Sequence, residues 1–150
     1  MINSTLCYIM RDGCLLMLHR TKKKNDPNGG KWIGVGGRLE EGESPDRCLV
    51  REVREETGFI LESYSMRGVV TFVSDVYGTE QMFLYTADRF SGTLRECDEG
   101  ELQWVPLDRL FSLNMWQGDR LFLEKTLKGD GFFTMRLEYA GDTLVGTETG

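Results

Sequence analysis

The first third of the chain alternates short apolar runs with turn signals. Residues 5–10 and 14–19 are rich in apolar and β-branched side chains and flank Arg11-Asp12-Gly13. An Asp-Gly pair between two such runs predicts a β-hairpin. Residues 21–30 contain three consecutive lysines, Asp-Pro and Gly-Gly, and are predicted to form a loop. Residues 31–37 contain three glycines and predict a short strand whose backbone can approach a ligand closely.

The clearest helix is predicted over residues 45–57. Ser44 is a good N-cap, and Pro45 suits the first helical position, where its missing N–H costs nothing. An apolar stripe follows at Leu49, Val50 and Val53, and Gly58 provides the C-terminal stop.

The second half of the chain predicts further strands and one more helix. We expect a hairpin of residues 64–73 and 80–87, a strand at 101–106, a helix at 119–127, and a strand at 132–139 that enters a last hairpin. This succession indicates an α+β fold with helices on both sides of a central mixed β-sheet. No repeat, low-complexity tract or linker divides the sequence, so residues 1–150 are expected to form one domain.

Composition and charge exclude several classes of protein. Hydrophobic residues make up 40% of the 150 positions and charged residues 28%, as in ordinary globular domains. The formal net charge of −6 argues against non-specific binding to nucleic acid polymers or anionic membranes. The apolar runs fall far short of the roughly 20 residues of a membrane-spanning helix, and the N-terminus lacks a signal-peptide pattern. We therefore expect a cytoplasmic protein. Nothing in the sequence marks an interface, so a monomer and a homodimer both remain open.

The four cysteines and the one histidine do not suggest a zinc site. There is no CxxC pair, and no cysteine lies near His19 in zinc-ligand spacing. We expect buried free thiols in a reducing compartment. We expect a structural role for His19, and the alternative is contact with a nucleotide from the edge of the sheet.

The chemistry of the chain is concentrated on the predicted helix 45–57. Glu52, Glu55 and Glu56 stand at i, i+3 and i+4, which places three carboxylates on one face within one turn. Like charges so close repel one another, and a divalent cation such as Mg²⁺ removes this conflict because hard ions prefer oxygen ligands. The alternative is a merely solvated, charged helix face.

The loop before the helix has features that suit the same ion. Gly36 and Gly37 permit a close backbone approach, so that their carbonyls can reach it. Arg51 can hold a glutamate by a two-pronged hydrogen bond and fix its orientation. Glu43 either stabilises the helix start through the macrodipole or accepts Arg51 as its partner.

These residues together resemble the Nudix box. The pattern consists of Gly37, Glu43 after five intervening residues, Arg51-Glu52-Val53 after seven, Glu55-Glu56 after one, and Gly58-Phe59 after one. From ordinary residue frequencies, a chance match anywhere in the chain has a probability on the order of 10⁻⁶. The resemblance implies an α/β/α sandwich that hydrolyses a nucleoside diphosphate linked to another group, with Mg²⁺ or Mn²⁺ as cofactor.

The resemblance also implies roles for individual residues. Glu52, Glu55 and Glu56 would be metal ligands together with the Gly36 or Gly37 carbonyl, and either Glu52 or Glu56 would be the general base. A further glutamate comes from a later loop in this family; Glu99 and Glu101 are the candidates and Glu99 is favoured, although a solvated turn is the alternative for both.

Resemblance to the MutT-like, 8-oxo-dGTP diphosphatase branch extends over most of the chain, through residues 31–38, 99–106 and 114–123. It implies that Trp116 stacks on a base and that Asp119 hydrogen-bonds a purine edge, whereas a core aromatic and a helix N-cap are the alternatives. In the mammalian enzyme of that branch, the residue after the tryptophan of the first stretch is an asparagine that contacts the base. This chain has Ile33 there, so base recognition is expected to differ. Lys23, in the lysine run, is a candidate for contact with the terminal phosphate, and a solvated loop is its alternative.

The expected reaction is therefore hydrolysis of a nucleoside triphosphate to the monophosphate and pyrophosphate. Two other functions remain open. One is Nudix chemistry on ADP-ribose, a dinucleoside polyphosphate or a nucleotide sugar. The other is a non-catalytic nucleotide sensor, which the intact glutamates disfavour.

Overall fold

Strands form most of the molecule. The computed structural model describes residues 1–129 and 131–150, and these fold into nine strands, two α-helices and one 3₁₀ helix. The strands are β1 (Ile2–Arg11), β2 (Cys14–Arg20), β3 (Trp32–Ile33), β4 (Val35–Arg38), β5 (Phe59–Ser74), β6 (Gly78–Gly92), β7 (Gly100–Pro106), β8 (Phe133–Ala140) and β9 (Thr143–Thr149). The helices are α1 (Pro45–Thr57), α2 (Gln117–Lys128) and the 3₁₀ helix η1 (Leu107–Ser112).

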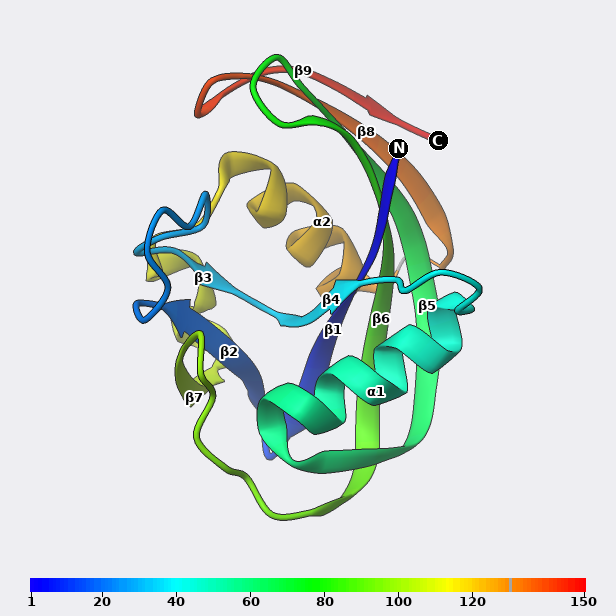
Figure 1. The fold of residues 1–150 in the computed structure, drawn as a ribbon, viewed down its shortest axis with the longest axis vertical. Coiled ribbons are helices and arrows are strands. Elements are labelled where there is room, and N and C mark those ends of the chain that lie inside the picture. The colour runs from blue at the N-terminus through cyan, green and yellow to red at the C-terminus, as the bar shows by residue number, and fades with distance from the viewer. Residues whose placement is uncertain (130) are drawn as a thin grey trace.

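The sheet is mixed, and β1 lies within it between β2 and β6 (Figure 1). Its main path runs β3-β2-β1-β6-β5-β8-β9, while β4 pairs with β1 and β7 pairs with β2. β1 is parallel to β6 and β5 is parallel to β8, whereas the other neighbours are antiparallel. The predicted first hairpin is confirmed: Asp12 and Gly13 have φ angles of 51° and 73°, the left-handed conformations of a type I′ turn.

Successive residues of β1 face two different hydrophobic cores, one on each side of the sheet. Leu6 and Tyr8 are buried in a cluster with α2, whereas Cys7 and Ile9 are buried in a second cluster with α1. The helices contribute Phe122 and Leu123 from α2 and Leu49 and Val53 from α1. Because neighbouring residues of a strand point to opposite faces, the two helices cover opposite sides of the sheet. The predicted α/β/α sandwich with a central mixed sheet is confirmed.

Helix α1 has the bounds that its end signals predict. Ser44 Oγ accepts a hydrogen bond from the Arg47 amide at 3.2 Å, which satisfies one of the free N–H groups at the helix start. Gly58 ends the helix with φ of 84°, and its N–H donates to the Arg54 carbonyl at 2.9 Å. A Cβ at position 58 would lie 2.4 Å from the Thr93 carbonyl oxygen, so glycine is required there by space as well as by conformation.

Helix α2 begins two residues earlier than the sequence predicts. Its N-cap is Trp116, which makes no side-chain capping bond, and Asp119 lies inside the first turn. The N-cap alternative for Asp119 is therefore wrong. The sequence prediction relies on a polar side chain next to the helix start. Here the partner is distant in the sequence: the Gly118 amide donates to the Tyr139 hydroxyl of β8 at 2.8 Å.

Other boundaries also differ from the prediction. The segment 31–37 contains two strands, β3 and β4, separated at Gly34, and β5 begins at Phe59 rather than at residue 64. The helix η1 lies in a stretch for which no element is predicted. All four cysteines are free, and Cys14 is only partly buried. No helix in the described part of the chain has the length and apolar character needed to cross a bilayer.

Candidate active site

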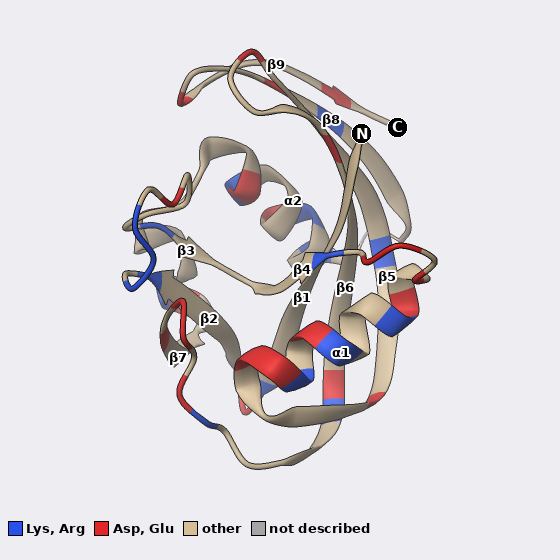
Figure 2. Cartoon of the chain, viewed as in Figure 1, with Lys and Arg blue, Asp and Glu red and all other residues tan. Residues whose placement is uncertain are grey.

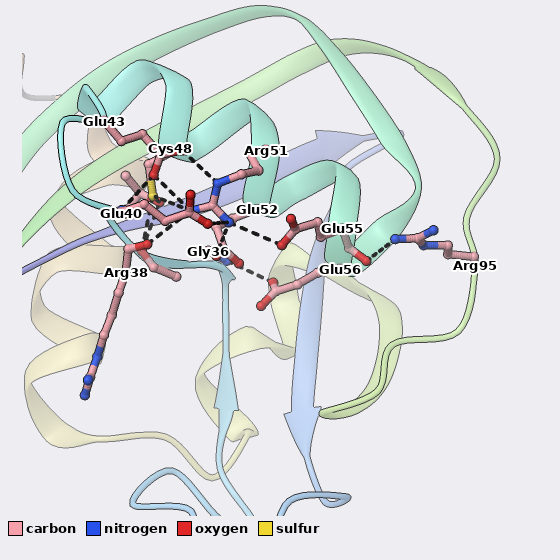
Figure 3. A network of polar contacts seen from close by, with 12 residues as sticks. Gly36, Arg38, Glu40, Glu43, Cys48, Arg51, Glu52, Glu55, Glu56 and Arg95 are labelled. Carbon is pink, nitrogen blue, oxygen red and sulfur yellow. Dashed lines mark hydrogen bonds and ion pairs between the residues drawn. The ribbon is translucent and has the colours of Figure 1, made fainter.

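The inner face of α1 lies directly against the glycines of β4 (Figure 3). The Gly36 amide donates to Glu56 Oε2 at 3.0 Å. A Cβ on Gly37 would stand only 2.4 Å from Glu52 Cδ, so a side chain at position 37 would collide with the Glu52 carboxylate. The two glycines thus let one strand lie close to two carboxylates on the helix: Gly36 is hydrogen-bonded to Glu56, and the Glu52 carboxylate occupies the space beside Gly37.

A third carboxylate reaches this place from the segment before β7. Burial raises the pKa of Glu56 well above its usual range; the Gly36 hydrogen bond opposes this rise, and the nearby carboxylates of Glu99 and Glu52 add to it. Glu101, the other candidate, is exposed on β7. The structure therefore brings Glu52, Glu56 and Glu99 together, although the chain separates Glu99 from the helix by more than forty residues.

Arg51 organises the outer part of the same helix face. Its Nε and Nη2 donate to the two carboxylate oxygens of Glu43 at 2.7 and 2.9 Å, and its Nη1 donates to Glu52 Oε1 at 2.8 Å. This is the two-pronged contact considered for Arg51, with Glu43 as the partner held by both prongs. The Arg51 hydrogen bonds are the main reason that the pKa of Glu43 falls to about 2.

Glu55 differs from the other two glutamates of the helix. Its side chain is 58% exposed, and its carboxylate lies 3.3 Å from Arg51 Nη1. Its backbone carbonyl accepts a hydrogen bond from Arg95 (Figure 3). Glu55 thus lies on the solvent side of the cluster, whereas Glu56 is buried against β4.

The donor set fits a hard divalent cation. Among residues 1–129 and 131–150, no group of three or more acidic, cysteine or histidine side chains is arranged to hold a metal as it stands. The chemistry nevertheless matches, because Glu52, Glu56 and Glu99 offer oxygen ligands whose mutual repulsion a cation would relieve. The space that Gly37 leaves for the Glu52 carboxylate is a second fitting feature.

The two residues expected to bind the base both lie at the start of α2. The Trp116 indole Nε1 donates to Asn28 Oδ1 at 2.8 Å, and Lys31 Nζ lies 4.6 Å from the centre of the Trp116 ring. Asp119 is only 7% exposed, and within the described residues its carboxylate accepts no hydrogen bond. Burial raises the pKa of Asp119 to about 7, against an opposing effect of Lys31.

Ile33 and Lys23 are placed apart from that pair. Trp32 packs against the same core cluster as Trp116, whereas Ile33, its neighbour on β3, packs against the α1 cluster on the other side of the sheet. Lys23 is exposed in the loop 21–30 and makes no hydrogen bond or ion pair with the described residues. Figure 2 shows the basic loop beside the acidic segment that leads into β7.

Sequence reasoning missed a buried polar network in the loop 21–30. Arg20 pairs with Asp26 at 2.7 Å and with Glu99 at 2.8 Å. The loop reads as solvated because lysines, Asp-Pro and Gly-Gly dominate it. No local signal marks Asp26 as buried, since its partner is the last residue of the preceding strand and the pairing depends on the fold.

Comparison with known proteins decides the family. The family model for the NUDIX domain matches residues 2–126. The chain belongs to the Nudix hydrolase family. It is 33% identical over 132 residues to the uncharacterized Nudix hydrolase YvcI of Bacillus subtilis, a match that covers 85% of this chain and 80% of the relative.

Two further known proteins are similar to this chain over most of its length. It is 30% identical over 130 residues to the oxidized purine nucleoside triphosphate hydrolase of Danio rerio, covering 85% of this chain and 81% of that one. The crystal structure of the MutT protein of Bacillus halodurans superposes with a TM-score of 0.89 at 24% identity, covering 99% of this chain and 97% of that one. The MutT-like resemblance and the fold inferred from the Nudix box are thereby confirmed.

Proposed function

We propose that this Nudix hydrolase converts a purine nucleoside triphosphate to the monophosphate and pyrophosphate, with oxidised purines such as 8-oxo-dGTP as substrates and Mg²⁺ or Mn²⁺ as cofactor. The observation that carries the proposal is the meeting of Glu52, Glu56 and Glu99 beside the glycines of β4. Trp116 and Asp119, at the start of α2, support a purine as the base.

The ion would be held by Glu52, Glu56 and Glu99, with Glu55 joining from the solvent side. Of the two glycine carbonyls, Gly36 is the better placed, because its N–H already faces Glu56 and the N–H and C=O of one strand residue point the same way. The Gly37 carbonyl instead accepts contacts from Thr5 Oγ1 at 3.4 Å and Cys48 Sγ at 3.5 Å. When bound, the cation neutralises phosphate oxygens and lowers the pKa of the attacking water.

Glu56 is proposed as the general base. The positive charge of Arg51, which is hydrogen-bonded to Glu52, lowers the proton affinity of the Glu52 carboxylate. Glu56 instead accepts the Gly36 amide on Oε2 and lies beside the carboxylate of Glu99, which raises its proton affinity. The other oxygen of Glu56, Oε1, can take the proton of the water that attacks phosphorus. Arg51 acts by fixing the orientation of Glu52 and Glu43.

The base would be held at the start of α2. Trp116 offers an aromatic face for stacking. Asp119 has a pKa of about 7, so near neutral pH its carboxyl group can either donate to or accept from a purine edge. Ile33 faces the α1 core cluster and supplies no such contact. Lys23, in the basic loop beside the Glu99 segment, is proposed to meet the terminal phosphate (Figure 2).

A panel of substrates tests this function. Release of pyrophosphate or phosphate with Mg²⁺ is measured for 8-oxo-dGTP, 2-hydroxy-dATP, dGTP, the common NTPs, ADP-ribose and Ap4A. Preferred release of pyrophosphate from an oxidised purine triphosphate supports the proposal. Preference for ADP-ribose or Ap4A would keep the Nudix chemistry and reject the substrate, and no turnover of any compound would favour a nucleotide sensor.

Gly37→Ala is expected to lower kcat and weaken Mn²⁺ binding by about 10–100-fold each, because the new Cβ displaces the Glu52 carboxylate. The unfolding temperature should change little, since the displaced group is the end of a flexible side chain. Kinetics and Mn²⁺ titration followed by electron paramagnetic resonance measure the effect.

Gly146→Ala on β9 is the matched control for this variant, because a Cβ there comes no closer than 3.5 Å to its neighbours. Wild-type kinetics and Mn²⁺ affinity in a folded Gly37→Ala protein would remove Glu52 from the metal site.

A further inference from the structure

A continuous line of hydrogen bonds joins the start of α2 to the acidic cluster. Trp116 Nε1 donates to the side-chain oxygen Oδ1 of Asn28 at 2.8 Å, and the backbone N–H of Asn28 donates to Asp26 Oδ1 at 3.0 Å. The other oxygen of Asp26, Oδ2, accepts from Arg20 Nε at 2.7 Å, and Arg20 Nη1 donates to Glu99 Oε2 at 2.8 Å. One oxygen of Asp26 therefore connects to Trp116 through Asn28, and its other oxygen connects to Glu99 through Arg20.

The middle of this line is buried although the loop around it is exposed. The side chain of Asp26 is 3% exposed and that of Arg20 is 10% exposed. A buried ion pair loses hydration on both partners, so it contributes little net stability even when its geometry is good. Its stronger effect is to hold the charged groups in fixed positions.

Backbone contacts attach the loop to both neighbouring segments. On the acidic side, Lys22 donates from its amide to the Glu99 carbonyl at 3.2 Å and from Nζ to the Cys97 carbonyl at 3.1 Å. On the other side, Asn114 Nδ2 donates to the Gly30 carbonyl at 3.1 Å. The loop thus forms a bridge between the segment that carries Glu99 and the segment that leads into Trp116; in Figure 1 it is the blue loop next to β3.

We propose that Asp26 is a positioning residue that links the two halves of the substrate site. Through Arg20 it fixes the carboxylate of Glu99, and through Asn28 it fixes the indole of Trp116. A displacement of Glu99 on metal binding is then transmitted to Trp116, and occupation of the base site is transmitted back by the same coupling. This inference rests on the proposed roles of Glu99 and Trp116.

The effect of removing the Asp26 charge has a definite sign. Asp26 neutralises much of the positive charge of the Arg20 guanidinium, which is paired with Glu99, a proposed metal ligand. Asp26→Asn releases Arg20 from its fixed position and also leaves its positive charge uncompensated near the cation. Both consequences weaken metal binding. The side-chain oxygen that asparagine retains at position 26 can still accept the hydrogen bond from the backbone N–H of Asn28.

Three variants separate the two halves. Asp26→Asn is expected to weaken Mn²⁺ binding to the nucleotide-free protein by about 10–100-fold, the usual cost of losing a group that orients a metal ligand. Asn28→Ala, which removes only the acceptor for Trp116, should keep the Mn²⁺ affinity within about twofold of wild type. Asp26→Ala should combine both defects.

The link itself is read from the tryptophan indole signals in ¹H–¹⁵N spectra, without any nucleotide. Addition of Mg²⁺ should shift the Trp116 indole signal in the wild type, and this response should be absent in Asn28→Ala although the metal still binds. Trp104, which packs beside the rings of Phe59 and Phe90 and makes no hydrogen bond or ring contact with the described residues of the loop, serves as the internal reference.

The outcomes distinguish this inference from the proposed function. If Glu99→Gln loses Mn²⁺ affinity but Asp26→Asn does not, or if bound Mg²⁺ leaves the Trp116 signal unmoved, the link is wrong and the metal site stands. If Glu99→Gln binds Mn²⁺ like the wild type, both the link through Asp26 and the proposed metal site at Glu99 are wrong. Should Asp26→Asn fail to fold, the double variant Arg20→Gln/Asp26→Asn removes both buried charges. The Mn²⁺ affinity of this double variant must still fall, because Glu99 has lost its ion pair with Arg20.

Discussion

Glu56→Gln is expected to lower kcat by about 10²–10⁴-fold, the range usual for loss of a general base. The amide keeps a side-chain oxygen for the Gly36 N–H but cannot take a proton from water. The fold should survive, because the buried Glu56 carboxylate is repelled by Glu99 and Glu52 and a neutral side chain removes that repulsion. Steady-state kinetics on the best triphosphate of the panel, with thermal unfolding alongside, measure both effects.

Two other glutamates calibrate this result. Glu55→Gln is expected to reduce kcat less than Glu56→Gln does, because Glu55 is 58% exposed and lies on the solvent side of the cluster. Glu62→Gln, at an exposed position of β5, is the matched control and should behave as wild type. A Glu56→Gln enzyme with wild-type kcat would refute the assignment of the base.

Asp119→Asn is expected to remove a pH-dependent loss of stability. The pKa of Asp119 rises from 3.8 to about 7 on burial, so between these values the unfolded chain releases a proton that the folded protein keeps. The free energy of unfolding therefore falls as pH rises through this window, and above pH 7 the full cost is about 4 kcal/mol. Below pH 3.8 the group is neutral in both states and has no effect.

Urea unfolding at about pH 5 and about pH 8 tests this prediction. From the lower to the higher pH, the free energy of unfolding of the wild type should fall by about 3 kcal/mol more than that of Asp119→Asn. Asp88→Asn, at an exposed site on β6, is the control and should follow the wild type. Equal pH dependence in the wild type and Asp119→Asn would mean that Asp119 is ionised without cost, and the argument that it can donate to a purine edge at neutral pH would fail.

Local chemistry explains what the sequence predicts well. The bounds of α1 follow from Ser44 and Gly58, because a capping hydroxyl and a left-handed glycine act on adjacent backbone groups. The juxtaposition of Glu52 and Glu56 follows from helical spacing alone. These features require no knowledge of distant parts of the chain.

Features that depend on distant contacts are predicted less well. The buried carboxylate of Asp26 lies in a segment whose composition indicates solvent exposure. It is held by Arg20, which also pairs with Glu99, and by Asn28, which is hydrogen-bonded to Trp116. The predicted start of α2 is wrong because the N-cap residue, Trp116, makes no capping bond and the Gly118 amide is satisfied by the distant Tyr139 hydroxyl. Glu99 can be predicted as a candidate only through resemblance, since no spacing rule brings it to α1.

The parallel pairing of β1 with β6 has a consequence for synthesis of the chain. Each pair of this ladder is separated by 78 residues, as between positions 2 and 80. A ribosome that adds roughly 5–20 residues per second needs about 4–16 s to make that interval. During this time the nascent β1 has only β2 and β4 as partners, and one edge of an apolar strand stays open to chaperones or to other chains. Translation speed between α1 and β6 should therefore influence the yield of folded protein more than translation speed after β6.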